Sequence, residues 1–254
     1  MTENRRVIFV VLACNEERNI GHLLHGLSRL DHNPHSSQVI VVNDGSQDRT
    51  RDIAVSWGHS LQIEVIDHPI NLGVGQGFRT GFVAALQHAG PDDIIVTMEA
   101  DNTCDLTILR QMLQQVETGS DVSLASCYAP GGAVLRTTPS RLILSKAANL
   151  MVRRLLRASE VHTYSSFYRA YRASALRRAM ERYGERFIEE PGFVCMVEVL
   201  VKLHRLGLRI TEVPMILDGG QRTGGSKMRI MRTIFCYVRF ILRDLLQRRT
   251  VRYP

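Results

Sequence analysis

The sequence predicts an α/β domain in which a mostly parallel central sheet is flanked by helices. Apolar runs typical of buried strands recur through the first half of the 254-residue chain, and segments with helical periodicity separate them. Because these runs are apolar on both faces, we expect helices to cover both faces of the sheet. With 44% hydrophobic residues and no repeat at a fixed period, the chain can form one large core.

The first strand is expected at residues 7–13, "VIFVVLA". Arg5 and Arg6 before it and Cys14 after it imitate a processed signal segment, but the apolar run is short for a signal core, so a buried strand is favoured. Further strands are expected at 38–43, 62–67, 93–98, 121–126 and 208–217.

Helices are expected between and after these strands. The first shows an apolar stripe at three- and four-residue spacings, formed by Ile20, Leu23, Leu24, Leu27 and Leu30. Later helices are expected at about 140–156 and 194–206, and a long basic helix closes the chain.

Cysteine and charge patterns restrict the function classes. The five cysteines are dispersed, with no CxxC pair, which indicates reduced thiols in a cytosolic chain. The net charge of +7 is local, because residues 222–254 hold nine Lys or Arg and one acid. The rest is near neutral, so we expect no general nucleic-acid-binding surface.

Polar clusters follow the first four strands: "CNEERN", "NDGSQDRT", "NLGVGQG" and "EADNT". Ligands bind at the carboxyl ends of strands in open parallel sheets, so these clusters are the candidate site. Glu99 and Asp101 are two apart and point to one side if the strand continues. Two such carboxylates repel unless a cation or a proton lies between them, and Mg²⁺ suits oxygen ligands. Asp105, before "LTILRQML", is better interpreted as a helix cap than as a metal ligand.

Two glycine-containing turns leave alternatives open. Asp44-Gly45-Ser46 is either a βα turn capped by Asp48 or Thr50 or a close approach to a ligand. The run from Gly73 to Gly77 has GxGxG spacing, not the dinucleotide fingerprint, and fits either a phosphate approach or a plain loop.

Taken in this order, the motifs resemble glycosyltransferase family 2, and within it the dolichyl- or polyprenyl-phosphate mannosyltransferase branch. The resemblance rests on "ACNEERNI", "VVNDGSQDRT", "NLGVGQG", "EADNT", "SRLILSKAANLMVRRLL", "RAYR" and "RITEVP...RTGGSKM", and covers nearly the whole chain. It implies a Rossmann-like GT-A fold with one catalytic domain over residues 1–221. Its nucleotide-sugar half would span about 1–120 and its acceptor half about 121–221, followed by a basic loop and amphipathic helix over 222–254.

The resemblance also implies residue roles. The residues expected to contact a nucleotide-diphosphate sugar are Ala13, Glu16, Asn43, Asp44, Gly75 and Asp101. Asp101, with Glu99, would hold Mg²⁺ or Mn²⁺ against the diphosphate. Arg141 and Ser145 match positions that face a lipid-phosphate acceptor in the family. Arg222 and Lys227 match a basic loop that closes over the phosphates, which makes Asp101 and Arg222 the expected catalytic residues.

The implied reaction is one inverting displacement that moves a mannose- or glucose-type sugar, from GDP-mannose or another donor, to a polyprenyl (dolichyl) phosphate. The metal would stabilise the leaving diphosphate. A phosphate monoester is already an anion at pH 7, so it needs no general base.

Departures from the branch keep two alternatives open. Glu99 replaces an Asp, Thr103 a Gln, Thr163 an Asp, and Cys127 an Arg, which removes a phosphate contact. One alternative is a hydroxyl acceptor on a sugar or small molecule, which would need a base, with Glu189, Glu190 or Glu198 as candidates. The other is a non-catalytic relative that binds a nucleotide sugar or a partner.

The tail is expected to form an amphipathic helix. Arg229, Arg232, Arg239 and Arg243 fall near one face, and Ile230, Ile234, Val238, Ile241 and Leu245 on another. The basic face could be solvated on a packed helix, or attach to an anionic membrane surface or to a membrane-anchoring protein partner. No run of 18 uncharged apolar residues is present, so the expected localisation is cytoplasmic with peripheral membrane association.

Overall fold

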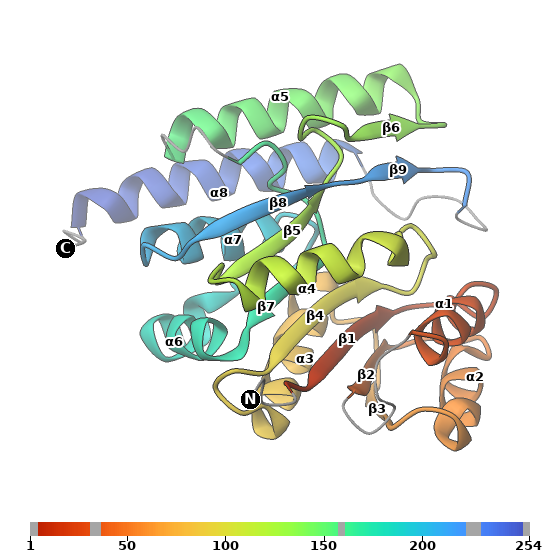
Figure 1. Ribbon diagram of the computed structural model, residues 1–254. Coiled ribbons are helices and arrows are strands. Elements are labelled where there is room, and N and C mark those ends of the chain that lie inside the picture. Colours follow the sequence, from red (N-terminus) through yellow and green to blue (C-terminus); the bar gives the residue numbers. More distant parts are fainter. Residues whose placement is uncertain (1–4, 31–36, 157–160, 222–229, 251–254) are drawn as a thin grey trace.

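A computed structural model describes residues 5–30, 37–156, 161–221 and 230–250 of the chain. A central sheet runs through the molecule and helices lie on both of its faces (Figure 1). The strands are β1 Val7–Ala13, β2 Ser37–Asp44, β3 Ile63–His68, β4 Ile94–Glu99, β5 Val122–Ser126, β7 Arg169–Arg172 and β8 Ile210–Pro214. The described helices are α1 Ile20–Ser28, α2 Thr50–Ser56, α3 Val74–His88, α4 Leu109–Glu117, α5 Pro139–Leu156, α6 Ala173–Tyr183, α7 Cys195–Arg205 and α8 Ile230–Thr250, with short 3₁₀ turns at Trp57–His59, Leu106–Ile108 and Gly184–Phe187.

The seven strands are ordered β3-β2-β1-β4-β7-β5-β8. β7 is antiparallel to β4 and to β5, whereas the other neighbouring strands are parallel. A second sheet pairs β6 (Ala133–Leu135) with β9 (Ile216–Asp218). The mostly parallel sheet with helices on both faces is therefore confirmed, and every expected strand lies within two residues of an observed one except the last.

The last expected strand, 208–217, is wrong as a single element. β8 ends at Pro214 and β9 begins at Ile216, and the two belong to different sheets. β7 was not expected as a strand, because "RAYR" is short and carries two arginines. Burial in the middle of the sheet explains it: Arg169 is fully buried and its guanidinium donates to the carbonyl oxygen of Tyr164.

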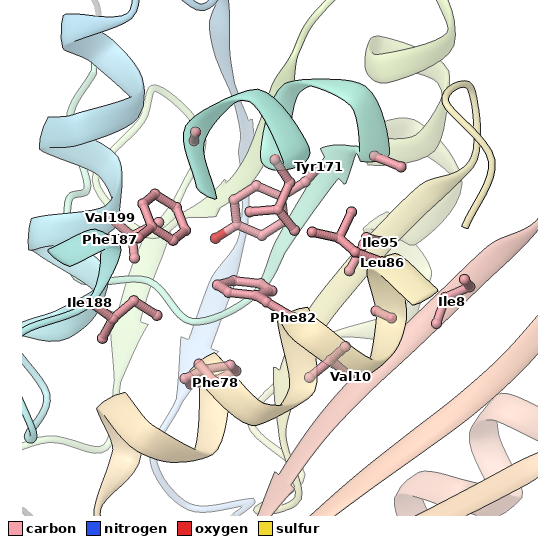
Figure 2. Packing of buried hydrophobic residues seen from close by; sticks show 14 of the residues in the cluster. Ile8, Val10, Phe78, Phe82, Leu86, Ile95, Tyr171, Phe187, Ile188 and Val199 are labelled. Carbon is pink, nitrogen blue, oxygen red and sulfur yellow. The ribbon is translucent and has the colours of Figure 1, made fainter. Parts of the chain in front are cut away.

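β1 supplies side chains to both faces of the sheet, as alternation along a strand requires. Ile8, Val10 and Leu12 pack under α3 and α6, and Phe9 and Val11 pack toward α1 and α4. Figure 2 shows the first of these clusters, in which Phe82 of α3 meets Tyr171 edge-on at 5.5 Å between ring centroids. All of β1 is buried, which confirms the strand interpretation of residues 7–13.

α8 lies beside α7 and below α5 (Figure 1), and its Phe240 joins a third apolar cluster with residues of both helices. Arg239 and Arg243 of α8 do not form the solvated basic face that was one of the two alternatives. Arg239 and Arg243 form ion pairs with Glu190 and Glu198, while Phe235 is 66% and Leu242 57% exposed. Arg229 and the side chain of Arg232 lie outside the described residues.

Candidate active site

A cleft of about 580 Å³ opens at the carboxyl ends of β1, β2 and β4. The first part of the chain contributes Leu12, Cys14, Glu16, Asp44, Asn71, Leu72, Gly73 and Val74 to its lining, followed by Glu99, Ala100 and Asp101. The polar clusters therefore meet at one edge of the sheet, as the parallel order predicts. We call this the donor cleft, after the nucleotide-sugar donor that the resemblance leads us to expect there.

Asp44 organises one wall of the donor cleft. Its carboxylate accepts hydrogen bonds from the backbone N–H groups of Leu72 (2.8 Å) and Gly73 (3.0 Å), and from His68 Nδ1 at 2.8 Å. Gly73 has φ of 92°, a left-handed conformation that favours glycine. Asp44, only 2% exposed, thus fixes the loop that leads into α3.

Glu16 lies in the turn after β1, where side chains from the turn after β2 hold the backbone. Its N–H donates to Thr50 Oγ1 at 2.7 Å, and Asn19 Nδ2 donates to its Oε2 at 2.6 Å. Asp48 accepts from the Thr50 N–H at 3.0 Å. The N-cap position of α2 is held by Arg49, without a side-chain cap, so Asp48 and Thr50 are wrong as N-cap residues. The two polar turns form one hydrogen-bonded unit.

Glu99 and Asp101 both line the donor cleft, although β4 ends at Glu99 and the chain turns before Asp101. The strand does not continue to Asp101, so the condition for their alignment is not met, and the turn brings both carboxylates to the cleft instead. Asp101 is 4% exposed, and its Oδ1 accepts from the Thr103 N–H (3.1 Å) and hydroxyl (2.6 Å). Thr103 therefore orients Asp101.

The carboxylates at this turn suit a hard divalent cation. No cluster of three His, Cys, Asp or Glu side chains is preformed among the described residues. Mg²⁺ commonly takes only one or two protein carboxylates and completes its shell with phosphate oxygens and water, so Glu99 and Asp101 fit it. Asp105 is confirmed as a cap, because its Oδ1 accepts from the Thr107 N–H at 2.9 Å.

Three residues expected at the nucleotide sugar lie just outside the donor-cleft lining. Ala13 is buried between two residues that do line it. Asn43 donates to Asp67 Oδ1 at 2.8 Å. Gly75 lies in the first turn of α3, where an added Cβ would stand 2.0 Å from the carbonyl oxygen of Glu190. Close packing against the backbone of Glu190 thus explains why residue 75 is a glycine. Contact of Ala13, Asn43 and Gly75 with the nucleotide sugar stays a prediction.

A second cleft of about 390 Å³ shares Glu99 and Phe193 with the donor cleft. We call it the acceptor cleft, after the acceptor that the resemblance leads us to expect near Ser145. Ser145 of α5 lines it, as do Cys127 and Tyr128. The side chain of Arg141, and all of Arg222 and Lys227, lie outside the described residues, so their roles stay predictions.

Cys127 does not replace the charge of the arginine found in the branch. Burial raises the pKa of its thiol to about 11, so the thiol is neutral at pH 7. Thr163 Oγ1, at the position of the branch's Asp, hydrogen-bonds Ser126 Oγ at 2.7 Å. Neither departure supplies a charge to the acceptor cleft.

The remaining wall of the donor cleft was missed by sequence reasoning. Residues 191–194 before α7 and Thr233 and Cys236 of α8 line it. No local motif marks these residues, since they reach the cleft only when α7 and α8 pack on the sheet.

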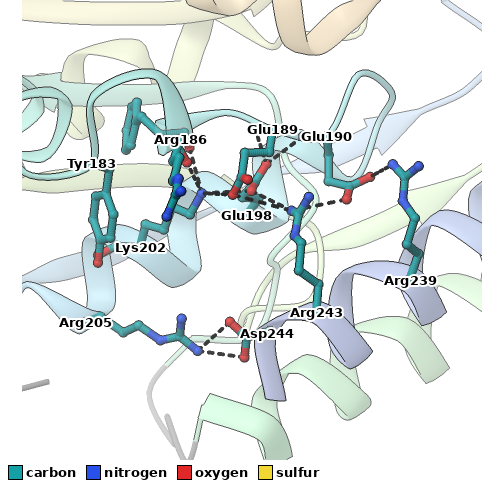
Figure 3. A network of polar contacts seen from close by, with 11 residues as sticks. Tyr183, Arg186, Glu189, Glu190, Glu198, Lys202, Arg205, Arg239, Arg243 and Asp244 are labelled. Atoms are coloured by element: carbon teal, nitrogen blue, oxygen red, sulfur yellow. Dashed lines mark hydrogen bonds and ion pairs between the residues drawn. The ribbon is translucent and has the colours of Figure 1, made fainter. Parts of the chain in front are cut away.

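The glutamates considered as bases are engaged elsewhere (Figure 3). Glu190 and Glu198 have side chains that are 0% exposed and paired with Arg239 and Arg243, and Glu189 lies 3.3 Å from Lys202 Nζ. None of the three lines the donor or acceptor cleft. Burial raises the pKa of Glu198, and Lys202 opposes this shift. As bases for a hydroxyl acceptor, these residues are wrong.

Comparison with known proteins adds a family and relatives. Residues 8–179 match the model of glycosyl transferase family 2. Undecaprenyl-phosphate mannosyltransferase of Micrococcus luteus is 32% identical over 88% of this chain and 87% of its own. Polyprenol monophosphomannose synthase of Mycolicibacterium smegmatis is 27% identical over 89% and 83%.

Among solved structures, glucosyl-3-phosphoglycerate synthase from Mycobacterium tuberculosis, in complex with Mn²⁺, UDP and glucosyl-3-phosphoglycerate, has a TM-score of 0.64 at 18% identity. The match covers 98% of this chain and 81% of that one. This likeness shows the fold, and the Rossmann-like GT-A architecture expected from the sequence is confirmed.

Proposed function

The chain belongs to glycosyl transferase family 2, and from that premise we propose that it transfers a hexose, such as mannose, from a nucleotide-diphosphate sugar to a polyprenyl phosphate. The observation that carries the proposal is the meeting of the donor and acceptor clefts at Glu99 and Phe193. Two adjoining clefts suit two substrates that exchange one group. The names of the relatives support the lipid phosphate.

The donor cleft would bind the nucleotide sugar. Asp44 and Glu16 would lie beside the nucleoside, and Asp101 and Glu99 beside the diphosphate. These two carboxylates would hold Mg²⁺ or Mn²⁺, which would neutralise the leaving diphosphate. Thr103 keeps Asp101 in one orientation through two hydrogen bonds, so little reorganisation is required on binding.

The acceptor cleft would present the nucleophile on the other side of Glu99. A phosphate monoester has a second pKa of about 6, so most of it is a dianion at pH 7 and needs no base. This agrees with the engagement of Glu189, Glu190 and Glu198 by cations outside both clefts. One displacement from the opposite side of the sugar would invert the anomeric centre.

The proposal includes peripheral association of the protein with a lipid surface, where a polyprenyl phosphate would be found. Large apolar side chains are exposed on α5 and α8, namely Ile143, Leu150, Met151, Ile234, Phe235, Val238 and Leu242. Insertion of such side chains into the interface contributes binding energy in proportion to their apolar area. Among the described residues, no helix is both long and apolar enough to cross a bilayer. An anchoring protein partner has no support in the relatives or the fold.

A donor panel tests the proposal. The protein is incubated with GDP-mannose, UDP-glucose and related nucleotide sugars, with Mg²⁺ or Mn²⁺, with and without polyprenyl phosphate, and release of nucleotide diphosphate is followed. Release that requires the lipid phosphate is expected, and Asp101→Ala should abolish it. Transfer only to a hydroxyl acceptor would contradict the proposed acceptor, and full activity of Asp101→Ala would contradict the metal site.

A further inference from the structure

α8 forms part of the donor cleft, although it lies more than a hundred residues from the motifs that define the site. Thr233 and Cys236 of α8 line the cleft beside residues 191–194. The position of this wall therefore depends on whatever holds α8 against the loop before α7.

Two arginines of α8 hold it there (Figure 3). Arg243 Nη2 lies 2.8 Å from Glu198 Oε1 and 3.2 Å from Glu190 Oε1, and Arg239 Nη2 lies 2.6 Å from Glu190 Oε2. The side chains of both glutamates are 0% exposed. Pairs with one fully buried partner are screened by solvent much less than surface pairs.

The same carboxylates hold the loop. Glu198 Oε2 accepts hydrogen bonds from the backbone N–H groups of Glu189 and Glu190, each at 2.8 Å. Its Oε1 also contacts Lys202 Nζ at 2.8 Å. The network balances three carboxylates with three cations, so removal of one guanidinium leaves negative charge uncompensated in a buried site.

The loop in turn packs on the start of α3. The N–H of Gly75 donates to the carbonyl oxygen of Pro191 at 3.0 Å. Two residues earlier, the N–H of Gly73 donates to Asp44. A path of polar contacts joined by short stretches of backbone therefore runs from Arg243, through Glu190 and Pro191, to Gly75, Gly73 and the carboxylate of Asp44 in the donor cleft.

We propose that Arg243 and Arg239 are positioning residues for the donor, which act through Glu190 and Glu198 to set α8 and residues 189–194 as a wall of the donor cleft. The inference rests on the proposed function, since it assigns this cleft to a nucleotide sugar. It predicts that loosening these pairs weakens donor binding more than it slows turnover at saturation.

Arg205, the last residue of α7, provides a matched control because it also ties α8 to α7. Its guanidinium lies 2.6 Å from Asp244 of α8, and both side chains are largely buried. Neither residue lines the donor cleft. Arg205→Ala therefore loosens α8 from α7 without breaking the chain of contacts to Asp44.

The experiment measures direct binding of GDP-mannose and of UDP-glucose, each with Mn²⁺, by calorimetry, together with KM and kcat for whichever donor turns over. Arg243→Ala should raise the donor Kd and KM about tenfold while kcat falls less than about threefold. Arg243→Lys should restore most of the affinity. Arg205→Ala should lower the Tm similarly but leave the donor Kd within about twofold of the wild type.

If Arg243→Ala does not fold, Arg239→Ala takes its place, because the Arg239 side chain is 47% exposed, and a smaller rise in Kd is expected. Equal donor affinity in the folded variant and the wild type overturns the inference and leaves the proposed function standing. An equal loss of affinity in Arg205→Ala also overturns it. A wild-type protein that binds none of the nucleotide sugars in the donor panel overturns both.

Discussion

Gly75→Ala should destabilise the protein and weaken donor binding together. An alanine Cβ at this position would lie 2.0 Å from the carbonyl oxygen of Glu190 and 3.1 Å from its carbonyl carbon. Atoms in folded proteins do not approach so closely, and the obstacle is backbone. Either the first turn of α3 or the loop at Glu190 must move by roughly an ångström to restore van der Waals contact.

Overpacking of this kind costs about 1–3 kcal/mol. For a chain of this size, each kcal/mol lowers Tm by about 2–4 °C, so we expect a fall of roughly 2–12 °C. Thermal unfolding followed by circular dichroism measures the change. Gly58→Ala is the control, because its added Cβ would meet only Ile63 Cγ2 at an ordinary 3.8 Å.

The result also separates two explanations of the glycine. A Tm within about 1 °C of the wild type would refute the packing argument. If that stable variant lost donor binding, Gly75 would serve close approach of a ligand, which is the alternative that the GxGxG run leaves open. If stability and donor affinity fall together, the contact between α3 and residues 190–191 sets the shape of the cleft.

Three further predictions concern the carboxylates, a buried thiol and the exposed apolar face. Thr103→Val removes the hydroxyl that donates to Asp101 at 2.6 Å, so kcat/KM should fall about 10- to 100-fold while Tm changes little. An unchanged kcat/KM would disprove the proposal that Thr103 orients Asp101. Because burial raises the pKa of Cys127 from 9.0 to about 11, the folded state holds this proton more tightly than the unfolded state. The stability that this proton contributes is complete below about pH 9 and is lost as the pH rises toward 11, by at most about 3 kcal/mol. The free energy of unfolding, measured with a denaturant at pH 8 and at pH 10.5, should therefore fall less between these two pH values in Cys127→Ala than in the wild type. Leu242→Glu should reduce the fraction of protein that sediments with anionic liposomes several-fold. Val55→Glu on α2, where the wild-type side chain is 49% exposed, should not reduce it. Equal effects of the two substitutions would argue against α8 as the lipid-facing element.

Local patterns predicted most of the first half of the fold. β1 lies at the expected residues, and β2, β3 and β4 lie within one residue of expectation. β1, β4 and most of β2 are buried, and a strand buried on both faces needs a continuous apolar run whatever surrounds it, whereas β3 is a half-buried edge strand. The cap role of Asp105 was also predictable, since the side chain bonds a backbone group two residues away.

Elements that depend on distant partners were predicted less well. β7 was missed because four residues with two arginines become a strand only between β4 and β5. The expected strand at 208–217 divides because its two parts find different partner strands. The three candidate bases failed for the same reason: their cations, Lys202, Arg239 and Arg243, are supplied by α7 and α8.

The sequence by itself determined the parallel sheet, the polar turns at its carboxyl edge and the carboxylates Glu99 and Asp101, because period, turn chemistry and short-range hydrogen bonding act over a few residues. Only the tertiary structure decided which face of α8 meets the protein, and that residues 189–194 complete the donor cleft. Helical periodicity separates the arginines of α8 from its apolar residues, but it cannot tell which of them will be buried. That choice depends on Glu190 and Glu198, whose buried carboxylates bind Arg239 and Arg243 and leave Phe235 and Leu242 exposed.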